Sequence, residues 1–406
     1  MVVTFFLLII YLAFISLGLP DSLLGVAWPA MQPDIGAAFE SAGLLSMMVT
    51  GGTIVSSLVS GSVIERFGTG IVTLISCLLT ASALLGFSFA PSLFWLILLA
   101  IPLGLGAGAV DAGLNNYVAN HYKAHHMSWL HCFWGVGATL GPIIMSYSMG
   151  TGNAWRDGYY TVSILQFALV FILLLTLPLW KIVASRHQPQ GMQDVHTGTD
   201  SASRGEAMVQ KRGNPLQIKG VKVTLLAFLF YCGVEVTVGL WGASFLVGTR
   251  GLPLETAAVW VSMYYGGITV GRFITGFVTL KINNLTLIRA GQVTAIAGAV
   301  LLLLPLHPYL SLIGLIVIGL GLAPIFPCML HETPARFGRA QSSKIMGYQM
   351  AVAYTGTTIL PPLFGIVAAQ ISIGLFPVVI LLFALIMMLS SEKVNRILYK
   401  SGKSTV

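Results

Sequence analysis

Charged residues are scarce in this sequence. Asp, Glu, Lys and Arg make up 8% of its 406 residues, whereas soluble domains contain about 25%. Hydrophobic residues reach 56%. This lack of charge excludes a soluble domain and indicates an all-α protein that crosses a membrane many times.

Cysteine is also rare, and no group of residues has the spacing of a metal site. The four cysteines lie in or at the ends of apolar segments: Cys77, Cys132, Cys232 and Cys328. We interpret them as packing residues rather than as disulfides or metal ligands. His121, His125 and His126 have no carboxylate or thiol partner nearby in the sequence, so we predict no metal there either.

The sequence contains no phosphate-binding loop. Gly104, Gly106 and Gly108 imitate the spacing of a nucleotide loop, but no strand precedes them and the segment is apolar. Such glycines are typical of close helix packing in membranes. We therefore predict no enzymatic activity and no cofactor, and we expect the energy source to be an ion gradient.

Twelve apolar segments are long enough to cross a bilayer, at about 20 residues for each span. The first six are residues 4–29, 41–62, 70–90, 93–120, 127–149 and 159–181. The second six are residues 221–247, 256–278, 284–306, 309–330, 343–369 and 373–391. The polar segment 182–219 separates the sets and has the composition of a flexible linker. We predict an N-terminal bundle (1–181), a C-terminal bundle (220–392) and a cytoplasmic tail (393–406).

Basic residues indicate the orientation. With the N-terminus inside, Arg66, Lys123, the linker and the tail are cytoplasmic, whereas Arg156 and Arg250 fall outside. This asymmetry obeys the positive-inside rule. It predicts a multi-pass protein of the plasma or inner membrane with both termini cytoplasmic. Because orientation accounts for most of the net charge of +8, we expect no nucleic-acid partner, and we expect a monomer in the lipid bilayer.

An acidic residue lies deep in the fourth predicted span. Asp111 and Asn115 are four residues apart, so they share one helix face. Ionisable residues at such depth usually face a bundle interior or a watery cavity and carry substrate or protons. The alternative is a buried structural carboxylate. Asn116 follows directly and is a further candidate for binding a polar solute.

An internal repeat supports two halves in the same orientation. Residues 48–61 and 263–276 share five identities at an offset of 215 residues, and Gly104-Leu105-Gly106 returns as Gly319-Leu320-Gly321 at the same offset. Six helices repeated in this way are related by an axis along the membrane normal, as in major facilitator transporters. The sequence thus predicts two pseudo-symmetric six-helix bundles.

Several motifs resemble those of this superfamily. Residues 61–68, with Glu65, Arg66 and Gly68, resemble its signature between the second and third spans. The pairing of Pro20-Asp21 with Asp111 is similar to the fucose:proton symporter family, and the resemblance implies roles for both acids in proton coupling and sugar binding. The chain departs from that family at Phe133-Trp134, where members with sugar substrates carry an asparagine.

Other polar and aromatic residues in the spans are candidates for the same site. Asp21 follows a proline that frees backbone carbonyls, and Glu235 lies near the middle of the seventh span. Asp21 has either a functional role or a structural hydrogen bond to a neighbouring helix. Glu235 takes up protons, accepts a hydrogen bond from solute, or locks two helices together. The side chains that we expect to bind solute are Asn115, Asn116, Trp28, His131, Trp134, Tyr231, Tyr265 and Gln349. For His131 and Trp134, anchoring at the membrane interface is the alternative.

Four charged residues are candidates for a gate: Glu65, Arg66, Arg272 and Glu332. Arg272 lies roughly 16 residues into its span, which at 1.5 Å per residue places it near the cytoplasmic end. A long side chain can reach the interface from there, so a structural role is the main expectation. Glu332, at the end of the tenth span, is its expected partner in a gate.

These features predict a secondary transporter that couples proton entry to uptake of a small polar solute, such as a sugar. Asp21, Asp111 and Glu235 are the candidate proton-coupling residues. A proton-driven drug exporter is the rival, because Gly137 to Pro142 resembles part of an antiporter signature. A receptor or scaffold would leave the buried acids unexplained.

Overall fold

The computed structural model describes residues 2–121, 124–150, 155–186, 215–279 and 281–400. Over these residues the regular structure is entirely helical. In the N-terminal half the helices are α1 (Val2–Asp21), α2 (Leu23–Asp34), α3 (Ser41–Phe67), α4 (Thr69–Phe89), α5 (Leu93–His121), α6 (Ala124–Gly150) and α7 (Trp155–Arg186). In the C-terminal half they are α8 (Val221–Arg250), α9 (Leu254–Val278), α10 (Asn284–Leu303), α11 (Tyr309–Leu322), α12 (Ile325–His331), α13 (Thr333–Phe337), α14 (Arg339–Gln370) and α15 (Phe376–Lys400), with 3-10 turns at Pro215–Gln217 and Ile373–Leu375.

Each of the twelve predicted spans coincides with one helix or with a broken pair. The first span is divided at Ser22 into α1 and α2, and the tenth is divided at residues 323–324 into α11 and α12. Prolines explain both breaks, because Pro20 and Pro324 cannot donate a backbone hydrogen bond to the preceding turn. The fold is therefore the predicted one, with two interrupted helices.

Two predicted boundaries were wrong. Helix α7 continues to Arg186, into the segment assigned to the linker, and α15 continues to Lys400, into the segment assigned to the tail. Polar residues suggested an end in each case, yet Val394 and Leu398 are buried in one apolar cluster with Val221, so this part of α15 belongs to the packed C-terminal bundle. Most of the predicted linker, 187–214, lies outside the described residues, as does Lys123.

Ten helical segments in the described chain are long and apolar enough to cross a membrane, and α6 and α9 are not among them. These two helices pack extensively against each other between the halves. A helix that faces another helix rather than lipid can carry polar residues, which would be costly in contact with lipid. Their lower hydropathy thus reflects their place in the fold.

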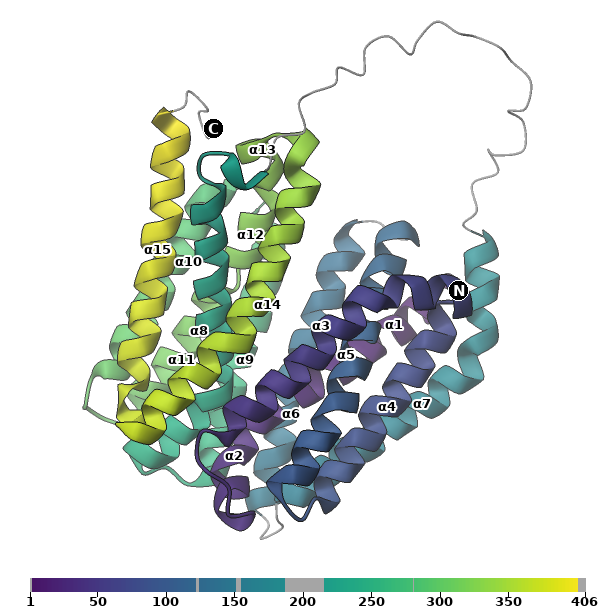
Figure 1. Ribbon diagram of the computed structural model, residues 1–406, viewed down its shortest axis with the longest axis horizontal. Helices are drawn as coiled ribbons and strands as arrows, with labels where there is room; N and C mark the ends of the chain where they lie inside the picture. Colours follow the sequence, from purple (N-terminus) through teal and green to yellow (C-terminus); the bar gives the residue numbers. More distant parts are fainter. Residues whose placement is uncertain (1, 122–123, 151–154, 187–214, 280, 401–406) are drawn as a thin grey trace, which may run out of the picture.

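The two bundles meet at the end of the molecule that carries α2 and diverge toward the end where α7 stops and α8 begins (Figure 1). The contacts between halves join α6 to α9, α3 to α14, and α2 to α8. Glycine permits the closest of them. A Cβ atom on Gly25 of α2 would lie 2.1 Å from the carbonyl oxygen of Gly239 in α8, and one on Gly43 would lie 2.7 Å from Cα of Pro362.

The arginines predicted to lie outside both stabilise the α2 end of the molecule. Arg156 forms an ion pair with Asp34, which also accepts a hydrogen bond from Trp155 Nε1 at 3.0 Å. In the other half, Arg250 donates to the carbonyl oxygens of Leu302 and Leu304 at the end of α10. Cations suit the negative end of a helix, so these contacts fix helix ends within each bundle.

Candidate solute and proton site

A cavity of about 310 Å³ lies between the two bundles. Its wall combines residues of α1 to α7 with residues of α8, α9 and α14. The polar and aromatic residues of the wall are Asp21, Ser46, Thr50, Thr53, Phe87, Trp134, Tyr159, Glu235, Tyr265, Tyr354 and Thr357. A space of this size, mainly apolar with a few polar groups, is typical of small-molecule sites.

Asp21 faces this cavity from the end of α1. Pro20 explains this position, because it interrupts the hydrogen bonds of the helix and α1 ends directly afterwards, at Asp21. Oδ2 of Asp21 accepts a hydrogen bond of 2.8 Å from Nε1 of Trp134 in α6. In the described structure the carboxylate is thus held by a neutral donor rather than by a cation.

Glu235 faces the same cavity from α8, in the opposite bundle, and it is paired with a cation. Oε1 of Glu235 lies 3.0 Å from an NH2 nitrogen of Arg272 in α9, and both side chains are less than a fifth exposed. The backbone carbonyl of Glu235 accepts a hydrogen bond from the Tyr264 hydroxyl at 2.9 Å. The two acids of the cavity therefore stand in different electrostatic surroundings.

The prediction for Arg272 was wrong. Its guanidinium lies deep between the halves, 5.6 Å from the ring centroid of Trp134, and does not reach the interface. Counting residues gave depth along the helix but not direction, and the carboxylate of Glu235 draws the side chain inward. The predicted partner Glu332 instead lies 3.7 Å from Arg336 and accepts a hydrogen bond from Asn284.

Asp111 lies beside the cavity rather than in its wall. Its Oδ1 accepts a hydrogen bond of 2.9 Å from Nδ2 of Asn115, as expected for residues one turn apart. The carboxylate is close enough to Asp21 and Tyr354 for electrostatic interaction with both. Nothing is described of the side chain of Asn116. A solute in the cavity would therefore contact Asp21 but not Asp111 directly.

Five of the predicted solute contacts do not reach the cavity wall, and one of them is Asn115, which is bonded to Asp111. Trp28 is fully buried and donates Nε1 to the carbonyl of Phe39 at 2.9 Å. Gln349 is also fully buried and exchanges hydrogen bonds with Thr333. Tyr231 packs on Phe326 behind the wall, and His131 contacts Phe14 on another side of α6. These residues support the helices around the site, whereas Trp134 and Tyr265 are part of the wall.

The predicted gate residues Glu65 and Arg66 lie at the end of α3, with exposed side chains. The guanidinium of Arg66 lies 5.4 Å from the ring centroid of Phe67. Directly after them, Gly68 adopts φ of 81°, a backbone conformation that favours glycine and permits the tight turn into α4. The same three residue types, Arg336-Phe337-Gly338, make the corresponding turn before α14, with φ of 93°.

Sequence reasoning missed several residues of the wall, among them Thr50, Tyr159, Tyr354 and Thr357. Tyr354 and Thr357 are three residues apart, so they share a face of a helix that is otherwise mostly apolar. That spacing could have indicated a polar face directed toward a cavity. Tyr159 could not have been found in this way, since a tyrosine near the start of a span usually marks the membrane interface.

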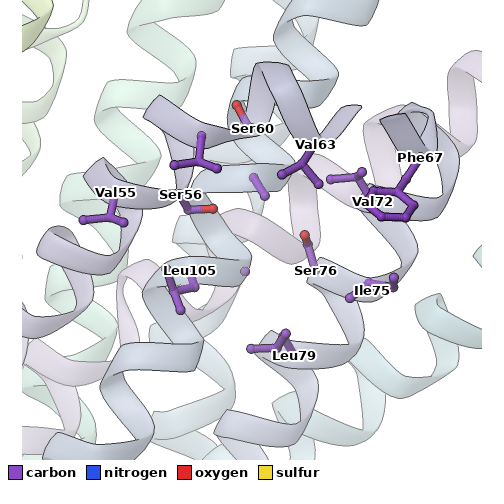
Figure 2. A pocket seen from close by; sticks show the side chains of 13 residues that line it. Val55, Ser56, Ser60, Val63, Phe67, Val72, Ile75, Ser76, Leu79 and Leu105 are labelled. Atoms are coloured by element: carbon purple, nitrogen blue, oxygen red, sulfur yellow. The ribbon is translucent and has the colours of Figure 1, made fainter. Parts of the chain in front are cut away.

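A second and larger cavity, of about 380 Å³, lies within the N-terminal bundle between α3, α4 and α5. Figure 2 shows its lining, in which Val55, Val63, Phe67 and Leu79 accompany the small side chains Ser56, Ser60 and Ser76. It contains no titratable group and does not involve the C-terminal bundle. The smaller cavity between the halves is therefore the candidate site for solute and protons.

Comparison with known proteins agrees with this architecture. The family model of the Major Facilitator Superfamily matches residues 10–352. The chain belongs to this superfamily. Its members are membrane transporters, so the protein is a multi-pass transporter and not an enzyme.

Relatives with assigned or suggested substrates are distant. The glucose/mannose transporter GlcP of Bacillus subtilis is 24% identical over 239 residues, covering 58% of this chain and 57% of that protein. A putative glucose/galactose transporter of Helicobacter pylori is 22% identical over 379 residues, covering 88% of each chain. The crystal structure of a D-xylose-proton symporter superimposes with a TM-score of 0.73 at 12% identity, covering 100% of each chain. This last similarity shows the shared fold.

Proposed function

We propose that this transporter couples the downhill entry of protons to the uptake of a sugar by alternating access. The observation that carries the proposal is the cavity between the halves, where Asp21 faces a solute-sized space without a cation bound to it. We further propose that the protein works as a monomer in the plasma or inner membrane, with both termini cytoplasmic.

The cavity wall suits a neutral polyol. Hydroxyl groups of Ser46, Thr50 and Tyr354 offer both donors and acceptors, and the rings of Trp134 and Tyr265 offer flat faces for the C–H side of a sugar ring. Glu235 and Arg272 cancel each other's charge, so the site holds no free cation to attract an anionic solute. The sugar transporters among the relatives support the same substrate class.

Asp21 is the better candidate for carrying the proton. A carboxyl group at this place can exchange a proton with the cavity, and its hydrogen bond to a neutral indole is compatible with the ionised and the protonated form. Glu235 is less suited, because protonation would leave the guanidinium of Arg272 without its counter-ion in a poorly solvated place. In this proposal a proton binds Asp21 from outside, sugar binds next, and both leave inward.

The described state fits one end of such a cycle. The halves touch at the α2 end, and several helix glycines toward the other end have no neighbour. A Cβ atom on Gly61 of α3, on Gly276 of α9 or on Gly347 of α14 would meet nothing within 4 Å. Because glycine allows close helix approach, we propose that these helices meet in the opposite state. The positive-inside rule makes the open end cytoplasmic.

Uptake by proteoliposomes tests the proposal. Purified protein is reconstituted in vesicles, an inward proton gradient is imposed, and labelled D-glucose, D-galactose, D-mannose and D-xylose are supplied in turn. We expect accumulation of at least one of these sugars above the outside concentration, abolished by a protonophore. Equal concentrations inside and outside in every case would contradict sugar:proton symport.

The exporter remains the alternative, and the structure explains part of the motif that suggested it. A Cβ atom on Gly137 would lie 2.0 Å from the carbonyl oxygen of Ile15, and one on Gly141 would lie 2.6 Å from that of Leu19. These glycines are thus needed for the packing of α6 on α1, whatever the direction of transport. Loss of a preloaded sugar or dye against its gradient when the outside is acidified would favour the exporter.

A further inference from the structure

Trp134 in the cavity wall touches charged groups of both bundles. Its Nε1–H is bonded to Asp21 of α1, in its own bundle, at 2.8 Å. The face of its ring lies under the guanidinium of Arg272, from the opposite bundle, at 5.6 Å from the ring centroid. Arg272 in turn is bonded to Glu235 at 3.0 Å. Asp21, Trp134, Arg272 and Glu235 therefore form a continuous series of contacts across the interface.

The helices around Trp134 leave it little freedom to move. A Cβ atom on Gly18 of α1 would lie 2.0 Å from the carbonyl oxygen of Trp134, so the two backbones are in direct contact. On the other side, a Cβ atom on Gly135 would lie 2.3 Å from Oγ1 of Thr269 in α9. Trp134 is thus held at a close contact between α1 and α6 on one side and between α6 and α9 on the other, so a change at Asp21 is transmitted to α9 over a short distance.

We propose that Trp134 is a positioning residue that conveys the ionisation state of Asp21 to the Arg272–Glu235 pair of the other bundle. An ionised carboxylate makes a charge-assisted hydrogen bond with the indole N–H, which polarises the ring. A more electron-rich ring attracts the cation above it more strongly. Protonation of Asp21 removes both effects. Arg272 is then attracted less strongly to the ring and keeps its ion pair with Glu235, and the face of the ring becomes available to a sugar.

This proposal rests on the proposed symport and gives a physical reason for its order, in which the proton binds before the sugar. It also has to be separated from other groups that respond to pH. Among the described residues, those within electrostatic reach of Asp21 or Arg272 are Asp111 on α5, His131 and Cys132 on α6, Tyr231, Cys232 and Glu235 on α8, and Tyr264 and Tyr265 on α9. The test must therefore report on Trp134 itself.

Tryptophan fluorescence of the purified protein, recorded from mildly acidic to mildly basic pH without any sugar, provides such a test. An indole whose N–H partner changes charge should change its emission. We expect a pH-dependent component in the wild type that is lost in both Trp134→Phe and Asp21→Asn. Trp129→Phe, on the same helix and half exposed, is the matched control and should retain the component.

The outcome separates this inference from the proposed function. A pH-dependent component that survives in Trp134→Phe, or that Asp21→Asn leaves intact, would overturn the role of Trp134, as would its absence from the wild type. Sugar accumulation by the wild type is measured separately and decides the symport. In vesicles, Trp134→Phe should bind sugar more weakly, and its sugar affinity should lose most of its dependence on pH. A purely structural role would lower activity equally at every pH.

Discussion

Asp21 and Glu235 face one cavity from opposite bundles, but their partners differ. Glu235 is bonded to the guanidinium of Arg272, and Asp21 is bonded only to the N–H of a tryptophan. Loss of the charge of Glu235 would leave Arg272 unpaired, whereas the indole N–H can bond Asp21 whether or not that carboxyl group carries a proton. The comparison teaches that depth in the membrane alone does not make an acid a coupling residue. The hydrogen-bond partner of the carboxylate determines whether it can serve as one.

The largest effect is expected from Asp21→Asn, which keeps the shape of the side chain but cannot release a proton. The variant should lose gradient-driven accumulation, which for one charge and 100 mV is worth about 2.3 kcal/mol, or about 40-fold. It should still exchange sugar between preloaded vesicles. Asp157→Asn, at an exposed position of α7, is the control. Full accumulation by Asp21→Asn would remove the distinction between the two acids.

Breaking the ion pair between Glu235 and Arg272 should affect the stability of the protein more than its proton coupling. Glu235→Gln leaves Arg272 without its counter-ion, and we expect unfolding in detergent to become easier by on the order of 2 kcal/mol, less than for a fully buried pair. The double variant Glu235→Gln/Arg272→Gln should recover part of this loss, because no unpaired charge remains. A double variant that is less stable than both single variants would show that each residue has a separate role.

A smaller effect is expected at Asp111, which lies beside the cavity and is bonded to Asn115. Its carboxylate acts on Asp21 only through space, so Asp111→Asn should change accumulation by about threefold, under 1 kcal/mol. Initial uptake rates over a range of outside pH provide the measurement. Complete loss of accumulation, with exchange intact, would make Asp111 a coupling residue equal to Asp21.

The smallest effect is expected for Arg289 and Glu392, whose ion pair has the same chemistry as Arg272 and Glu235 but lies in water. Arg289 is half exposed, so Glu392→Gln should cost about 0.2–1 kcal/mol and leave transport unchanged. Denaturation at low and high salt is the measurement, since salt screens only the exposed pair. Equal losses at both ion pairs would mean that burial does not strengthen the one in the cavity.

Local patterns in the sequence were sufficient to predict the positions of the helices. Apolar runs of about 20 residues give spans because an unbonded peptide group in lipid is costly, and this cost acts on each segment separately. The prolines at 20 and 324 even mark the two breaks. The repeat at an offset of 215 residues predicted two halves in the same orientation, and the family match agrees with them.

Side-chain partners could not be predicted in this way. Arg272 was expected at the interface with Glu332, and the structure pairs it with Glu235, 37 residues away. Trp28 and Gln349 were expected to contact solute, and the structure buries both among helices. A side chain at the right depth can point in any direction around the helix, and only the packing of neighbouring helices selects one.

What the sequence by itself determined is the class of protein, the number and order of its spans, and the acids that lie within them. These follow from hydropathy and from the cost of a charge in lipid, which depend on nearby residues alone. The tertiary structure decided which acid is neutralised and which is left to a neutral donor. Asp21 and Trp134 are 113 residues apart in the chain, and their contact arises only because glycines let α6 pack closely against both α1 and α9.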